Sequence, residues 1–227
     1  ADVSSFDREN IQARIRGQVL ADVCACEGTK LQGRCAFTNN GNKTEVALNY
    51  FTEYGDGAGT ASFFGDYWKG EIYDLAAFIN ARAGKEMIPK GIIDIVPSAE
   101  LSAEQNVDEG KGDPIFYPFH DKLLLSWIER RWDPTIVLQR LLKGTLEQDL
   151  GCAAGTISKY FPTKQSLVDS VEWAWLQYSY EGKRHKLPPT LVTSRRAFGF
   201  DRRDTIAGGY FTVEYYRLKA EVLAKAA

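Results

Sequence analysis

The chain predicts many helices but very few strands, and this imbalance limits the folds open to it. Apolar residues recur at helical spacing in seven segments, which are 5–26, 43–54, 67–82, 119–131, 134–142, 164–180 and 213–226. Only 35–38 reads as a strand, while the β-branched run 92–97 is predicted to be a strand or an extended edge. A parallel sheet buried on both faces needs several near-continuous apolar strands. We therefore expect either a mostly helical fold or a sheet whose main part lies outside this chain.

Length and charge set further bounds. At 227 residues the chain can bury a sizeable core, and we read 1–227 as a single domain with a helical tail at 204–227. Its 28 basic and 30 acidic residues nearly cancel, so the chain lacks a global basic field that would attract nucleic acid. No apolar run approaches the roughly 20 residues that cross a bilayer. We expect no membrane partner, a cytoplasmic location, and four cysteines that stay free thiols.

The first candidate ligand site is the tract 36–45, which leads from the predicted strand through a Gly/Asn turn into a helix. Glu45 lies in the first turn of that helix, where backbone N–H groups favour phosphate and a carboxylate can hold the accompanying metal ion. A plainer interpretation is also open. Gly41 can serve only as a turn residue, Asn42 only as a helix cap, and Glu45 only as a solvated acid.

Other polar residues stand near turns or helix starts and have plain alternatives as well. Lys69 begins a predicted helix, Asp108 and Glu109 are adjacent in the long loop 98–118, and Lys183 precedes a basic, proline-interrupted run. A surface lysine, a solvated acidic loop and a cation at a helix C-terminus would explain them equally well.

Taken together, six blocks occur in the order seen in NAD synthetases, and the chain resembles that family from about residue 5 to residue 203. The blocks are 10–16 (NIQARIR), 41–45 (GNKTE), 54–57 (YGDG), 67–73 (YWKGEIY), 97–101 (PSAEL) and 108–109 (DE). The run 194–203 (SRRAFGFDRR) looks like the glutamine-dependent branch of the family.

The resemblance implies a fold and a reaction. The fold is α/β, of the Rossmann-like adenine nucleotide α-hydrolase (ATP pyrophosphatase) type, represented here by a helix-rich C-terminal portion that lacks the early strands. The reaction uses ATP to activate the nicotinate carboxylate of deamido-NAD as an acyl adenylate. Ammonia attacks the adenylate, which gives NAD, AMP and pyrophosphate. Mg²⁺ and lysines would offset the phosphate charge, and a homodimer or higher homo-oligomer is expected.

The resemblance also assigns roles to individual residues of this chain. Glu45 would bind Mg²⁺; Thr38, Lys69 and Ser98 would bind ATP; Asn10, Arg14, Asp56 and Lys183 would bind deamido-NAD; and Asp56 and Lys69 would be the catalytic residues.

The chain also departs from the family pattern. The Ser-Gly-Gly-x-Asp-Ser loop expected upstream of Asn10 does not occur in these 227 residues, nor does the glutaminase domain of the glutamine-dependent branch. We therefore expect this chain to correspond to the C-terminal part of a synthetase domain and not to make NAD alone. Two alternatives stay open, which are another ATP-dependent amidating or adenylylating enzyme of the same fold and a non-catalytic helical interaction module.

Overall fold

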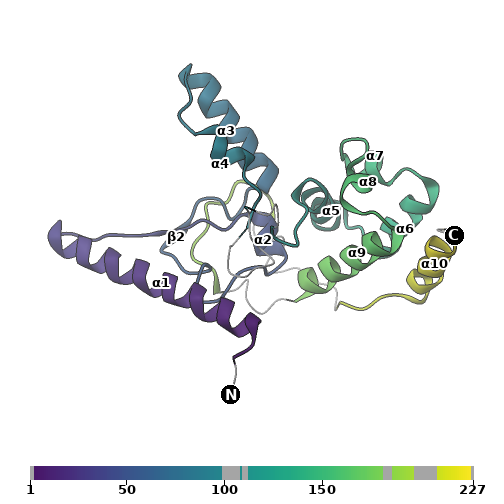
Figure 1. Cartoon of the computed structure of the whole chain (residues 1–227), viewed down its shortest axis with the longest axis horizontal. Helices are drawn as coiled ribbons and strands as arrows, with labels where there is room; N and C mark the ends of the chain where they lie inside the picture. The colour runs from purple at the N-terminus through teal and green to yellow at the C-terminus, as the bar shows by residue number, and fades with distance from the viewer. Residues whose placement is uncertain (1–2, 99–107, 109–111, 181–185, 197–208, 226–227) are drawn as a thin grey trace.

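The structure is a computed structural model that describes residues 3–98, 108, 112–180, 186–196 and 209–225. Its described part consists of helices and one small sheet (Figure 1). Helix α1 (Ser5–Lys30) and the pair α3 (Lys69–Ala83) and α4 (Lys90–Asp94) project from the centre, and the later helices gather in a compact group on the other side. The prediction of many helices and few strands is confirmed.

Helix α1 is longer than predicted and exposes its apolar stripe. Ser4 caps its start by accepting a hydrogen bond from the Asp7 N–H at 3.1 Å. The helix continues past residue 26, where we expected it to end, and its Gly28 lies buried against the loop at 33–35. Its stripe of Ile11, Ile15, Val19 and Val23 is between 46% and 59% exposed. No helix among the described residues is long and apolar enough to cross a membrane.

Small residues attach α1 to the rest of the molecule. Ala13 and Gly17 are its buried positions in the middle of the helix, and they face the loop around Tyr54 and Gly55. A Cβ added at Gly17 would lie 2.9 Å from the carbonyl oxygens of both loop residues, so the two backbones pack too closely for any side chain.

The sheet contains two parallel strands, β1 (Thr38–Asn39) and β2 (Ala61–Ser62), with Thr38 opposite Ala61. The predicted strand 35–38 thus lies at the right place but is shorter and displaced toward its end. Ser62 also forms a parallel bridge with Thr190, which brings a distant segment to the other edge of β2.

Two predicted elements near this sheet are corrected. Helix α2 (Lys43–Ala47) is much shorter than the predicted 43–54. It ends because Asn49 adopts a left-handed conformation (φ 52°), from which its amide donates hydrogen bonds to the carbonyls of Gln177 and Tyr180. The run 92–97 is not a strand, because its first residues complete α4, Ile95 ends that helix, and no strand is assigned at 96–97.

The compact group of helices holds the core. It contains α5 (Tyr117–Arg130), α6 (Pro134–Lys143), α7 (Leu146–Leu150), α8 (Thr156–Tyr160), α9 (Lys164–Ser179) and α10 (Val213–Ala224), of which α7 and α8 were not predicted. Leu123, Trp127 and Val171 lie in its main cluster. Tyr215 and Leu218 join a second cluster through which α10 packs on α6 and α9. Helices α2 and α3 both pack on α5, which therefore positions the polar residues at their starts.

Candidate functional site

Glu45 lies at the start of α2 and is hydrogen bonded through both carboxylate oxygens. Asn42 caps the helix by accepting from the backbone N–H groups of Thr44 and Glu45, and Glu45 accepts from the Asn42 N–H at 3.0 Å. The other oxygen of Glu45 accepts from the Tyr117 hydroxyl at 2.9 Å. Burial raises the pKa of Glu45, and the Asn42 N–H, Lys69 and Tyr117 act against that effect. The plain interpretation of Asn42 as a cap is confirmed, but Glu45 is not a solvated acid.

Lys69 lies beside the same tyrosine. Its ammonium lies 5.4 Å from the ring centroid of Tyr117 and 5.7 Å from that of Tyr73. Its positive charge acts against the rise in the pKa of Glu45, so the ammonium and the carboxylate interact electrostatically. The Tyr117 hydroxyl also lies 3.4 Å from a carboxylate oxygen of Asp113. A cation and a buried carboxylate thus converge on Tyr117, and an ammonium beside a carboxylate suits a phosphate with its metal ion.

Asp121, one turn after Tyr117, joins the two helix starts. One of its oxygens accepts from the Thr44 hydroxyl of α2 at 2.5 Å, and the other accepts from the Gly70 N–H of α3 at 2.9 Å. Burial raises the pKa of Asp121 to about 6, although both hydrogen bonds oppose the shift. Asp121 therefore holds the geometry between Glu45 and Lys69, and it titrates just below neutral pH.

The raised pKa of Asp121 predicts an unusual pH dependence of stability. Between its ordinary pKa and about 6, the folded chain retains a proton that the unfolded chain releases, so deprotonation opposes folding as the pH rises. Asp121→Asn keeps one acceptor for Gly70 and can bond Thr44 without titrating. We expect the free energy of unfolding of the wild type to fall by about 3 kcal/mol relative to this variant between about pH 4 and 7.

Urea unfolding at several pH values measures this difference, and Asp74→Asn, at an exposed aspartate of α3, is the matched control. A wild-type advantage over Asp121→Asn that is the same at pH 4 and pH 7 would contradict the assignment.

A second group of predicted residues meets where α1 crosses the loop 52–57. Asn10 accepts from the Thr52 hydroxyl at 2.9 Å, and Arg14 donates from Nε to the Glu53 carbonyl at 3.4 Å. Asp56 shapes the same loop by accepting from the Thr52 N–H at 2.8 Å. Arg14 and Asp56 are exposed. The structure therefore brings the three predicted dinucleotide residues of α1 and the loop onto one surface.

The remaining predicted residues are less closely tied to either group. Thr38, in β1, is exposed and donates to the Asn40 side chain at 3.0 Å. Ser98 is half-buried in the segment after α4, next to Pro97, whose carbonyl accepts from the Asp113 N–H at 2.9 Å. Lys183 and Glu109 lie outside the described residues, and Asp108 is exposed.

Sequence reasoning missed Tyr117, Asp121 and the buried pair Lys43 and Asp66. Tyr117 and Asp121 are four residues apart on α5 and so lie on one helix face, together with apolar core residues. A carboxylate on an otherwise apolar helix face was the available signal. Lys43 and Asp66 form an ion pair at 2.9 Å with side chains that are 2% and 0% exposed. Nothing in the local sequence distinguishes them from surface charges.

Glu45 fits one kind of metal site only. Within the described residues, no group of three or more His, Cys, Asp or Glu side chains could hold a metal ion. Mg²⁺ commonly takes one or two protein carboxylates and completes its shell with phosphates and waters. Glu45 therefore suits the role of a single protein ligand to a Mg²⁺ that arrives with a nucleotide.

Comparisons with known proteins identify the family. The family model described as NAD synthase matches residues 1–148. The chain is 32% identical to a glutamine-dependent NAD(+) synthetase of Xanthomonas campestris over 202 residues, which are 89% of this chain and 31% of that protein. It is 34% identical to an NH(3)-dependent NAD(+) synthetase of Chlorobaculum tepidum over 137 residues, 60% of this chain and 44% of the relative.

The fold agrees with these matches. A crystal structure of a glutamine-dependent NAD(+) synthetase from Cytophaga hutchinsonii superposes with a TM-score of 0.59 at 19% identity, covering 92% of this chain and 30% of that one. This chain thus spans about a third of the glutamine-dependent proteins it resembles. The matched model and the identity to named relatives show that the chain belongs to the NAD synthase family.

Proposed function

We propose that this chain provides part of the active site of an enzyme that makes NAD. The enzyme activates the nicotinate carboxylate of deamido-NAD with ATP, and ammonia converts the acyl adenylate to NAD with release of AMP. The observation that carries the proposal is the convergence of Glu45 and Lys69 on Tyr117, in a chain of the NAD synthase family. The relatives' names support the reaction, since each is a NAD(+) synthetase.

The residues around Tyr117 hold the phosphates. The ammonium of Lys69 neutralises phosphate charge, and Ser98 and Thr38 bind the same nucleotide. Glu45 is the protein carboxylate that would hold Mg²⁺, which when bound supplies positive charge to the phosphate oxygens. Lys69 and Glu45 are both half-buried, and charges that are partly removed from solvent interact more strongly than in water.

The second group binds the dinucleotide. The guanidinium of Arg14 can hold a carboxylate or phosphate through two oxygens at once, and Asn10 lies one turn before it on α1. Asp56 lies across from them on the loop 52–57, where it accepts a proton or hydrogen bond from the incoming ammonia. Lys183 is a further proposed ligand of deamido-NAD. The short parallel sheet is part of the Rossmann-like sheet of the family fold, and the cytoplasmic location stays a prediction.

Arg14→Ala separates this proposal from another adenylylating enzyme of the same fold. We expect the variant to bind deamido-NAD about 10 to 100 times more weakly, because a hydrogen bond to a charged group is worth about 1.5–3 kcal/mol. Its affinity for ATP should be unchanged, since Arg14 bonds the Glu53 carbonyl of the loop 52–57, whereas the Tyr117 hydroxyl contacts Glu45 and Asp113. Isothermal titration with each ligand measures both, and unaltered affinity for deamido-NAD would favour the other enzyme class.

Self-association is a further expectation. The exposed stripe of Ile11, Ile15, Val19 and Val23 is a contiguous apolar surface beside the predicted dinucleotide residues of α1. We propose that a second copy covers this stripe. Sedimentation velocity at micromolar concentration should give a dimer or a larger oligomer, and Ile15→Asp should give a monomer. A monomeric wild type would contradict the proposal.

The activity itself is tested in a chimera. This chain replaces the matched 202-residue segment of the Xanthomonas campestris synthetase, and NAD formation is followed with deamido-NAD, ATP and ammonium or glutamine. We expect the chimera to form NAD and this chain alone to form none. NAD formation by the chain alone would refute the second expectation, and a folded chimera without activity would count against the proposed function.

A further inference from the structure

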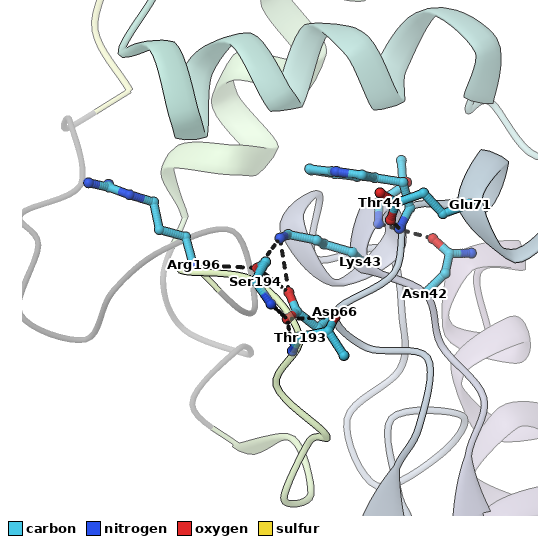
Figure 2. A network of polar contacts seen from close by, with 9 residues as sticks. Asn42, Lys43, Thr44, Asp66, Glu71, Thr193, Ser194 and Arg196 are labelled. Atoms are coloured by element: carbon cyan, nitrogen blue, oxygen red, sulfur yellow. Dashed lines mark hydrogen bonds and ion pairs between the residues drawn. The ribbon is translucent and has the colours of Figure 1, made fainter.

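Lys43 is a buried lysine at the first position of α2, and its ammonium is paired with other groups of the protein. Its Nζ lies 2.9 Å from Asp66 Oδ1, and 5.0 Å from the ring centroid of Trp68. Both charged side chains are almost fully buried, at 2% and 0% exposure. Figure 2 shows the ammonium pointing toward Asp66 and Ser194, away from Asn42 and Thr44. A buried charge of this kind is costly unless it is paired and hydrogen bonded.

Asp66 binds a segment that lies far along the chain. It accepts from the N–H groups of Thr193 and Ser194, both at 2.6 Å, and from the Ser194 hydroxyl at 2.7 Å. Lys43 Nζ donates to the same hydroxyl at 2.8 Å (Figure 2). Lys43, Asp66 and Ser194 thus form a closed triangle of hydrogen bonds between residues up to 151 positions apart.

The same segment adds to the sheet. The Ser62 N–H donates to the Pro189 carbonyl and the Leu191 N–H donates to the Ser62 carbonyl, both at 2.9 Å. We call residues 189–194 the docked segment. Its first part pairs with Ser62 at the edge of β2, and its last part is fixed by Asp66. Burial would raise the pKa of Asp66, but the hydrogen bonds from Ser194, Lys43 and the Thr193 N–H outweigh it and lower that pKa. Asp66 is therefore ionised at neutral pH.

Three successive residues of α2 connect this network to the candidate site. Lys43 contacts Asp66 and the docked segment, Thr44 donates to Asp121, and Glu45 accepts from Tyr117. Helix α2 has only five residues, so its first turn cannot shift at one of these contacts without disturbing the others.

We propose that Lys43 and Asp66 are positioning residues, which hold the docked segment against the start of α2 and thereby fix Glu45 and Thr44 in the nucleotide site. The inference rests on the proposed function only for what the site binds. Under this proposal, Lys43 does not contact phosphate. The alternative is that Lys43 is a phosphate ligand, since it directly follows a Gly/Asn turn at a helix start. The two assignments differ in a measurable way, because they give Asp66 opposite effects on nucleotide affinity.

The first test is hydrogen exchange of the 227-residue chain. In Lys43→Met and Asp66→Asn, the amides of Leu191, Thr193 and Ser194 should exchange about ten times faster or more, since each variant removes a charged hydrogen bond. The amides of α9 should keep their wild-type rates. Glu53→Gln is the matched control, because it breaks the exposed Glu53–Lys186 pair near the same segment and should leave the three amides unchanged.

The second test is the affinity of the same proteins for Mg·ATP. Under the proposal, Lys43→Met and Asp66→Asn both bind Mg·ATP more weakly, by about tenfold, since both release α2. If Lys43 were instead a phosphate ligand held back by Asp66, Asp66→Asn would bind Mg·ATP more tightly than the wild type. That result, or unchanged exchange in the docked segment of both variants, would overturn the proposal.

The two tests distinguish a failure of the proposed function from a failure of the positioning role. A wild-type chain that binds no Mg·ATP argues against the proposed function, and the exchange rates then decide the positioning role alone. If Lys43→Met and Asp66→Asn do not fold, Ser194→Ala replaces them, because it removes only the shared hydroxyl. It should speed exchange at Thr193 and Ser194 about threefold or more, and wild-type rates there would overturn the proposal.

Discussion

Lys43→Met should lower the free energy of unfolding of this chain by about 3–5 kcal/mol, the cost of leaving one member of a buried ion pair without its partner. Asp66 would stay buried with its negative charge opposed only by the hydrogen bonds of Thr193 and Ser194. The methionine is close in length to lysine, so little packing against Trp68 is lost. Urea unfolding followed by tryptophan fluorescence measures the loss at pH 7.

The effect of Lys43→Met should depend on pH. Because the pKa of Asp66 is lowered in the folded chain, its stabilising contribution is present at neutral pH and is lost as the pH falls through that lowered pKa. The difference between wild type and variant should therefore shrink in strong acid. Glu53→Gln, which breaks an exposed pair, should cost much less than Lys43→Met, because solvent screens the exposed charges. A loss for Lys43→Met as small as that of the control would contradict a structural role for the buried pair.

Lys69→Met should lower the rate of NAD formation by the Xanthomonas campestris chimera about 100- to 1,000-fold, the usual effect of removing one group that stabilises charge in a transition state. The reason is the position of its ammonium over Tyr117, beside Glu45, at the start of α3. The fold should survive, since Lys69 is only half-buried and its contacts in the described structure are with aromatic rings.

The control for Lys69→Met is Lys85→Met, an exposed lysine between α3 and α4 that should leave the rate unchanged. Equal rates for Lys69→Met and the control, in folded proteins, would remove Lys69 from the catalytic machinery.

The start of a helix could be predicted from the sequence where the residue that caps it lies close by in the chain. Asp133 and Thr163 cap α6 and α9 through bonds to residues three positions on, and both helices begin where predicted. The shortage of strands was also predictable. The end of α2 was not, because Asn49 takes its left-handed conformation from contacts with Gln177 and Tyr180, over 120 residues away.

Some residues of the candidate site could be predicted from the sequence, and others could not. Glu45 and Lys69 stand in short motifs at helix starts, and the structure places both at Tyr117. Tyr117 and Asp121 come from α5, over 70 residues after α2. The carboxylate on an apolar helix face marked Asp121, but the contacts of both residues with α2 exist only in the folded chain. The pair Lys43 and Asp66 was equally hidden, because burial and pairing are properties of the folded chain.

We propose that Glu45 and Lys69 form part of a NAD-synthesising site, and the products of the chimera test this most directly. With deamido-NAD, ATP and ammonium, we expect NAD, AMP and pyrophosphate in equal amounts, and release of all three about 100- to 1,000-fold more slowly in Lys69→Met. A folded chimera that releases AMP without NAD, or that forms NAD at the same rate with and without Lys69, would contradict it.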